Sequence, residues 1–135
     1  MTNDMQYQKS KLDSIYTMLK LTYGLIPVIA GADKFFNILT NWQMYLNPML
    51  LKMIPFTPLQ CMYAVGVIEI IAGCVVLFIN TRLGAYVITL WLVAISINLI
   101  SMGLFYDVAV RDIVMAIGAL ALAQLAELRE SLQRD

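Results

Sequence analysis

The side chains of this sequence that can do chemistry are few, and they lie within or beside long apolar stretches. Glu69 is the clearest of them, because it is the one charged residue between Lys52 and Arg82. An ionisable group at the centre of a membrane helix costs about 2.5–3.5 kcal/mol on translocon-based scales, and it persists where it is paired or where function requires it. Glu69 is therefore the first candidate for a functional or structural role inside the protein.

Two glycines predict which way the Glu69 carboxyl points. Gly66 and Gly73 stand three positions before and four positions after Glu69, so all three residues share one face of a helix. Small residues on a membrane helix let a neighbouring helix approach closely. We therefore expect Glu69 to face protein and not lipid.

Other polar residues stand near the ends of neighbouring apolar stretches, where they can meet Glu69. Two alternatives remain open for them. In a structural role, Glu69 pairs with Arg111 or Lys34, or stays protonated, and sets the helix register. In a functional role, the cluster lines a pocket for a small ligand, a quinone head group or a proton path. The candidate ligand-binding set is Glu69, Arg111, Lys34, Asn98, Asp112 and Asp33.

The composition explains why these residues are exceptional. Of the 135 residues, 61% are hydrophobic and 13% are charged, and the mean hydropathy is +0.76. Soluble domains carry about 45–50% apolar and about 25% charged residues. The sequence therefore predicts an integral membrane protein whose first partner is the lipid bilayer. The net charge of zero argues against a nucleic-acid partner.

The residue types also bound the chemistry. The sequence has no histidine, the usual near-neutral acid–base group and the commonest metal ligand. Cys61 and Cys74 stand thirteen residues apart on one stretch, which separates them by roughly 20 Å along a helix. A disulfide joins Cα atoms about 4.4–6.8 Å apart, so these two cysteines are not expected to pair. The sequence therefore shows no evident cofactor, and we assign no metal-ligating residues.

A sulfur-rich segment leaves one exception open. Thioethers and thiolates are ligands that select Cu(I), although methionine is also the ordinary filler of irregular apolar gaps. A transient copper site is thus an alternative to simple packing for Met44, Met49, Met53, Cys61 and Met62.

Four apolar stretches are long enough to cross a bilayer core about 30 Å thick. We predict spans at about 15–37, 59–79, 84–105 and 111–128, with a polar N-terminus over 1–14 and a polar C-terminus over 129–135. The predicted fold is all-α, an integral membrane four-helix bundle with an interfacial segment between its first two spans. That segment, 38–58, holds Trp42, Tyr45 and three prolines, which suits either the membrane interface or an ordered cap.

The basic residues predict the orientation. An even number of spans places both termini on one face, together with Arg82. Five basic residues lie on that face and three on the other. The excess favours both termini in the cytoplasm.

Short motifs in order along the chain resemble the DoxX-like family of small four-span bacterial membrane proteins. They are Gly31-Ala32-Asp33-Lys34-Phe35, then Gly66-Val67-Ile68-Glu69 with Gly73, then Thr81-Arg82-Leu83-Gly84-Ala85, and Arg111-Asp112. The resemblance runs from about residue 15 to 129. Asp33 stands where many members have histidine, which weakens any metal or proton-transfer role at that position. The resemblance implies a bacterial-type inner membrane and relatives in varied redox settings.

The leading hypothesis is a non-catalytic membrane subunit that anchors or organises a redox partner. The alternative is an oxidoreductase subunit that binds a quinone or another small molecule, in which Lys34 and Arg111 hold the ligand and Glu69 exchanges a proton. A small transporter or channel is a third option, which in a bundle of this size calls for a homo-oligomer.

Overall fold

The structure, a computed structural model, describes residues 2–135 and is all-α, as the sequence predicts. Its elements are α1 Asn3–Asp33, the 3-10 turn η1 Trp42–Tyr45, α2 Pro48–Met53, α3 Pro58–Cys74, the π-helical segment η2 Val75–Ile79, α4 Thr81–Met102 and α5 Tyr106–Arg134. Four helices of the described chain are long and apolar enough to cross a membrane, with η2 extending α3 to Ile79.

The helix ends have local causes. Thr57 and Gln60 form a reciprocal capping box at the start of α3, with Pro58 in the first turn, where its missing N–H costs nothing. Asn80 accepts from the Leu83 N–H at 3.0 Å and so separates η2 from α4. Gly103 ends α4 with a φ of 69°, a left-handed conformation that glycine adopts without strain.

The helices do not coincide with the predicted spans. Helix α1 begins at Asn3 and ends at Asp33, and α5 runs from Tyr106 to Arg134, whereas the spans were expected at 15–37 and 111–128. The prediction followed hydropathy, which marks the apolar part of a helix and not its polar continuation. Residues 3–14 and 129–134 are helical extensions beyond the apolar stretches, and residues 34–37 already belong to the connector.

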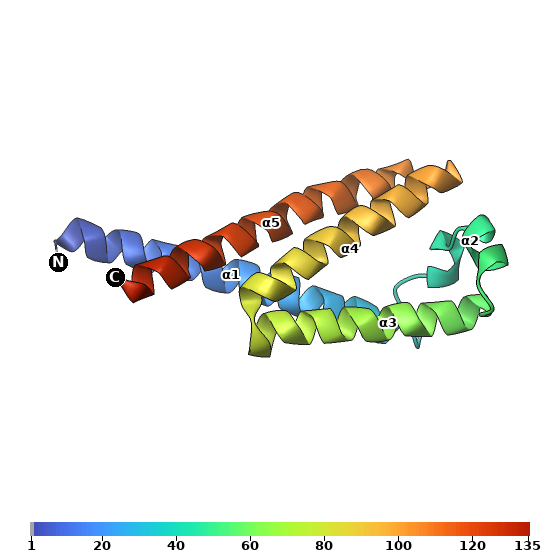
Figure 1. The fold of residues 1–135 in the computed structure, drawn as a ribbon, viewed down its shortest axis with the longest axis horizontal. Helices are drawn as coiled ribbons and strands as arrows, with labels where there is room; N and C mark the ends of the chain where they lie inside the picture. The colour runs from blue at the N-terminus through green and yellow to red at the C-terminus, as the bar shows by residue number, and fades with distance from the viewer. Residues whose placement is uncertain (1) are drawn as a thin grey trace.

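The helices pair as α1 with α3 and α4 with α5. Figure 1 shows both termini at one end of the molecule and the connector, residues 34–57, at the other. Helices α3 and α4 meet at the η2 turn and diverge towards the connector end, as Figure 1 also shows. Tyr23 of α1 joins the pairs by donating its hydroxyl to the Met115 carbonyl of α5 at 2.8 Å.

The core lies where η2, α4 and α5 meet, and its residues are mostly small: Ala72, Val76, Ala85, Ile88, Ala119, Leu122 and Ala123. Many large apolar side chains point outwards instead, among them Phe78, Leu90 and Ile117. Membrane helices pack through small residues because lipid offers apolar side chains as good an environment as protein does. This distribution agrees with a multi-pass membrane protein.

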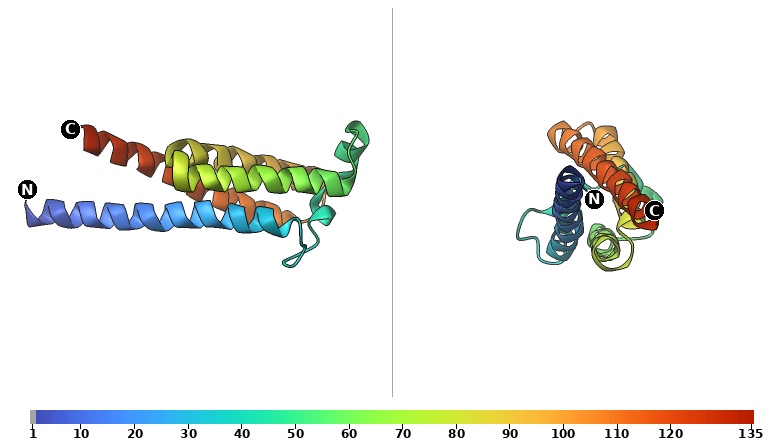
Figure 2. Two further views of the ribbon diagram at one scale, coloured as in Figure 1. Left: turned by 90° about the horizontal axis from the view of Figure 1, so that it is seen from below. Right: turned by 90° about the vertical axis from the view of Figure 1, so that its left-hand side faces the viewer.

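The connector begins at a level within the length of α3. Gly31 of α1 lies level with Gly66 of α3, because a Cβ added to Gly31 would come 2.5 Å from the Gly66 carbonyl oxygen. Helix α1 ends two residues beyond that level, while α3 extends eight residues beyond it. At 1.5 Å per residue, α1 stops roughly 9 Å short of the end of α3. Figure 2 shows the connector starting beyond the end of α1, with a loop that projects from the bundle.

Candidate functional site

Lys34 and Glu69 form a buried ion pair where the first two spans touch. The Lys34 Nζ lies 2.6 Å from the Glu69 Oε2, and the two side chains are 5% and 10% exposed. Lys34 is the first residue after α1, and Glu69 lies in the middle of the span formed by α3 and η2. The prediction that Glu69 faces protein is confirmed. Of the two counter-charges considered for Glu69, Lys34 makes the contact.

The glycines next to this pair bring the helices close enough for it to form. Gly31 packs against Gly66, and Gly24 packs against Gly73. Each contact pairs the backbone of α1 with the backbone of α3, without side chains between them. The Lys34 side chain therefore has only a short distance to cross between the helices to contact Glu69.

Trp91 of α4 makes the second polar contact of the Glu69 carboxylate. Its indole N–H donates to the Glu69 Oε1 at 3.3 Å, so the two carboxylate oxygens contact different helices. Trp91 and Glu69 both lie near the midpoints of their spans. The carboxylate thus links the α1–α3 pair to the α4–α5 pair in the diverging half of the bundle.

Trp42 covers the other side of Lys34. The Lys34 Nζ lies 3.7 Å from the centre of the Trp42 ring, a cation–π contact that desolvation strengthens. The Trp42 indole N–H donates to the Asp33 Oδ2 at 2.8 Å. The Lys34 charge is therefore enclosed by a carboxylate and an aromatic face.

Asp33 organises the backbone of the connector. Its carboxylate accepts from the Ile38 N–H and from the Leu39 N–H, both at 3.0 Å. Irregular backbone at membrane depth needs such partners, because the hydrocarbon offers none. Asp33 thus holds the chain as it leaves α1, and all its observed contacts are within residues 33–42.

Asn98 fixes the far end of the same connector. Its amide donates to the Tyr45 carbonyl at 2.8 Å. The Asn47 amide donates to the Ser101 hydroxyl at 2.8 Å, and the Tyr45 ring meets the Phe105 ring edge-on with centroids 4.9 Å apart. The connector is therefore attached to α4 and to the turn before α5 as well as to α1.

Arg111 and Asp112 take different places on α5. Arg111 is exposed and makes no ion pair within residues 2–135, so it does not contact Glu69 as one alternative supposed. Asp112 is buried, with 8% of the residue exposed, and it lies within electrostatic reach of Arg111, Glu69 and Lys34. No hydrogen bond to its side chain occurs in the described chain. Among the buried members of the set within residues 2–135, Asp112 is the one that makes no ion pair or side-chain hydrogen bond.

The sulfur-containing residues lie in different environments. Met49 and Met53 are exposed on α2, whereas Cys61 and Met62 are buried on α3, and both cysteines are free thiols. Within residues 2–135 no three His, Cys, Asp or Glu side chains are grouped so that they could hold a metal ion.

Trp42 and Trp91 are the site residues that the sequence reasoning missed. A signal was present for Trp91. Tryptophan favours the two membrane–water interfaces, so a tryptophan at the middle of a predicted span calls for a polar partner on a neighbouring helix. The role of Trp42 depends on the path of the connector, which hydropathy does not specify.

Comparison of the chain with protein-family models, with curated protein sequences and with solved structures finds no match. The resemblance to the DoxX-like proteins therefore stays a prediction from the residues.

Proposed function

We propose that the protein is a non-catalytic subunit of a bacterial-type inner membrane that anchors or organises a redox partner at its connector. The observation that carries this proposal is the combination of a firmly held connector with an outward apolar surface. The polar side chains of the connector make contacts within the protein, and several of its apolar side chains are exposed.

The polar contacts support the anchoring role because they close the site from within. The Lys34 ammonium contacts Glu69 and Trp42, and the Trp91 N–H contacts Glu69. Asp33 is occupied by connector backbone and by Trp42. Contacts of this kind fix the geometry of the helices, as a scaffold requires.

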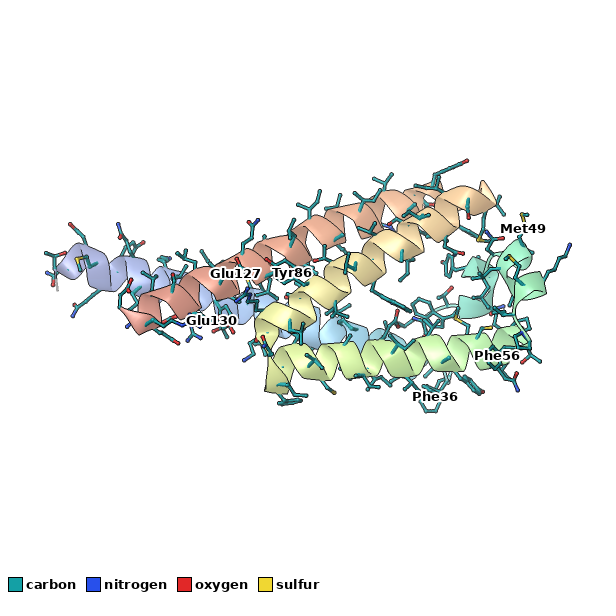
Figure 3. The ribbon with its side chains drawn as sticks, viewed as in Figure 1. Phe36, Met49, Phe56, Tyr86, Glu127 and Glu130 are labelled. Atoms are coloured by element: carbon teal, nitrogen blue, oxygen red, sulfur yellow. The ribbon has the colours of Figure 1, made fainter. Side chains whose placement is uncertain are left out.

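The outward surface of the connector supplies a place for a partner. We call this set the connector patch: Phe36, Ile38, Leu39, Met49, Met53 and Phe56. Their exposed fractions run from 58% for Phe56 to 81% for Ile38 and Met53. Figure 3 shows Phe36, Met49 and Phe56 projecting away from the bundle. Methionine and aromatic residues are enriched in protein interfaces.

Two parts of the proposal rest on the sequence. The redox nature of the partner and the inner membrane follow from the resemblance to the DoxX-like proteins. The cytoplasmic position of both termini follows from the distribution of basic residues, and it places the connector patch on the outer side.

Affinity purification from gently solubilised membranes tests the anchoring role. We expect a second membrane or redox protein to co-purify in a fixed ratio with the wild-type chain and to be lost from a Met49→Gln/Met53→Gln variant. The matched control is Met5→Gln/Leu132→Gln, which changes two exposed apolar residues at the opposite end. The proposal fails if no protein co-purifies stoichiometrically in several detergents, or if the two variants behave alike.

Asp112 favours a second candidate, the binding of a small molecule beside the ion pair. The donors that face Glu69, from Lys34 and Trp91, are already engaged, while the carboxyl of Asp112, a residue that is 8% exposed, has no hydrogen-bond partner in the described chain. A ligand with a hydroxyl donor, such as a quinol, therefore fits these residues better than an oxidised quinone, whose carbonyls need donors. In this role Asp112 would accept from the ligand hydroxyl, and Lys34 with Glu69 would bound the site.

The intrinsic fluorescence of the protein can test this candidate directly. The chain has two tryptophans, and both contact the Lys34–Glu69 pair, so quenching reports a ligand that enters there. A short-chain benzoquinol should quench the wild-type emission saturably, and Asp112→Asn should weaken its affinity. Asp107→Asn is the control, because Asp107 is exposed on the same helix. Equal, non-saturating quenching in all three proteins would exclude the site.

A further inference from the structure

A polar recess lies at the terminal end of the bundle, far from the ion pair. Its volume is about 360 Å³, and it is bounded by α1, the η2 turn and the last turns of α5. The lining residues are Tyr16, Lys20, Ile79, Asn80, Thr81, Ala126, Arg129, Glu130 and Gln133. None of them belongs to the site described above.

Two cations of the recess retain free donors. Lys20 makes no ion pair within residues 2–135. Arg129 directs its Nε to the Asp13 Oδ1 at 2.9 Å, and no ion pair of the described chain engages its two terminal nitrogens. A fork of guanidinium donors matches the oxygens of a phosphate.

Tyr16 contacts both cations of the recess. The Arg129 Cζ lies 4.5 Å from the centre of the Tyr16 ring, and the Lys20 Nζ lies 5.9 Å from the same centre. One aromatic ring thus carries the ammonium and the guanidinium at the wall of a single recess.

The acidic residues nearby are already occupied. Arg82 approaches Glu127 at 3.1 Å and Glu130 at 3.5 Å, and Tyr86 donates to Glu127 at 2.6 Å. Figure 3 shows Glu127 and Glu130 on α5 next to Tyr86 of α4. Glu130 lines the recess with its charge balanced by Arg82, so the charge that has no counter-ion in direct contact is that of Lys20.

The remaining lining suits an amphiphile. The Asn80 side-chain oxygen Oδ1 accepts from the Leu83 N–H and caps α4, which leaves the side-chain NH2 group of Asn80 free to donate. Ile79 forms an apolar part of the wall and is 77% exposed, next to the exposed Phe78. Lys20 stands fourteen residues before Lys34, or roughly 21 Å along α1, so the recess lies near one membrane surface.

We propose that this recess binds the phosphate of an anionic membrane phospholipid, with Lys20 and Arg129 on the phosphate oxygens and the acyl chains along Ile79 and Phe78. Basic pockets between membrane helices are suited to anionic head groups, and each cation near the surface contributes about 1 kcal/mol. The exposed apolar rim favours a lipid over free phosphate, although the two share the same phosphate chemistry.

Native mass spectrometry of protein released from nanodiscs tests the proposal. The nanodiscs contain phosphatidylglycerol with phosphatidylcholine, or phosphatidylcholine alone, and a third arm adds inorganic phosphate to the former. We expect one phosphatidylglycerol molecule to be retained by the wild type, and Lys20→Gln to weaken its retention roughly fivefold. Lys20 makes no ion pair in the described chain, so this variant should fold, and Arg129→Lys tests the guanidinium fork separately.

The matched control is Lys9→Gln, which removes one exposed cation at the same end of α1. Equal loss in Lys9→Gln and Lys20→Gln would overturn the proposal, because bulk charge would then explain retention. Retention unchanged in Lys20→Gln would overturn it as well. Competition by inorganic phosphate at millimolar concentration would assign the recess to a free anion and overturn the lipid as its ligand.

Discussion

Lys34 and Glu69 place opposite charges inside the apolar bundle, and each would be costly there without the other. Their side chains are 5% and 10% exposed, so water screens the pair little. Trp91 and Trp42 satisfy the groups that the ion pair itself leaves free. Removing one member leaves a buried charge without its counter-ion, while removing both leaves none.

We predict that Glu69→Gln lowers the free energy of unfolding by about 3 kcal/mol or more, because the Lys34 ammonium stays buried without a counter-charge. The double variant Lys34→Met/Glu69→Gln should be more stable than Glu69→Gln alone, since it removes that charge. Reversible unfolding in mixed micelles measures both values.

Glu130→Gln provides the matched control for this prediction. Glu130 also contacts a basic residue, Arg82, but the two side chains are 43% and 47% exposed. An exposed pair contributes about 0–1 kcal/mol, so the control should unfold close to the wild type. Equal losses for Glu69→Gln and Glu130→Gln, or additive losses in the double variant, would show that burial does not set the strength of the Lys34–Glu69 pair.

At the scale of the elements, two glycine contacts set the distance between α1 and α3. Gly24 meets Gly73 and Gly31 meets Gly66, and the two glycines of each helix are seven positions apart. Two turns of helix separate the contacts, so both fall on one face of each helix. The ion pair depends on this close approach, because Lys34 follows Gly31 by three residues.

Gly66→Ala should therefore destabilise the protein by about 1–3 kcal/mol, the usual cost of overpacking. The added Cβ would come 2.7 Å from the Gly31 carbonyl oxygen. This clash is with the backbone of α1, so it is relieved only if α1 and α3 move apart. The same unfolding measurement in mixed micelles gives the loss.

The control for Gly66→Ala is Ala64→Val, which adds methyl groups two residues away on an exposed face of α3. It should leave the stability within about 0.5 kcal/mol of the wild type. If Gly66→Ala is equally harmless, the α1–α3 approach is looser than the structure shows.

At the scale of the whole molecule, both termini lie at one end and the connector at the other, as Figure 2 shows. The distribution of basic residues predicts that the terminal end is cytoplasmic. Two exposed glutamines mark the two ends, Gln60 in the first turn of α3 and Gln133 near the end of α5.

Cysteine labelling tests this orientation. In a background without Cys61 and Cys74, a membrane-impermeant maleimide should label Gln60→Cys in spheroplasts, whose inner membrane is intact. Gln133→Cys should be labelled after lysis alone. The reverse pattern would place the termini outside, and labelling of both positions in intact cells would contradict an even number of spans.

The sequence predicted the all-α fold and the four spans because apolar length is a strong signal. It also placed Glu69 against protein, because Gly66 and Gly73 mark the packed face. The helical extensions at residues 3–14 and 129–134 were missed, since polar residues carry no hydropathy signal for a helix that continues beyond the membrane.

The assignment of partners within the site was harder to predict. Lys34 and Arg111 are equally suitable counter-charges by type, and only the packing of α1 on α3 selects Lys34. Asp33 and Asn98 were candidates for a ligand site with a structural role left open, and in the structure both hold the connector. Their roles depend on a chain path through residues 34–47 that short-range patterns do not encode.

The Lys34–Glu69 pair has a consequence for the biogenesis of the protein. Its two members belong to successive spans, so the second span reaches the insertion machinery with an acid that its predecessor can neutralise. If the first span had already diffused into the lipid, Glu69 would enter as a lone charge or as an acid that takes up a proton. The geometry thus favours joint release of the first two spans, as a hairpin whose charges cancel before the third span is made.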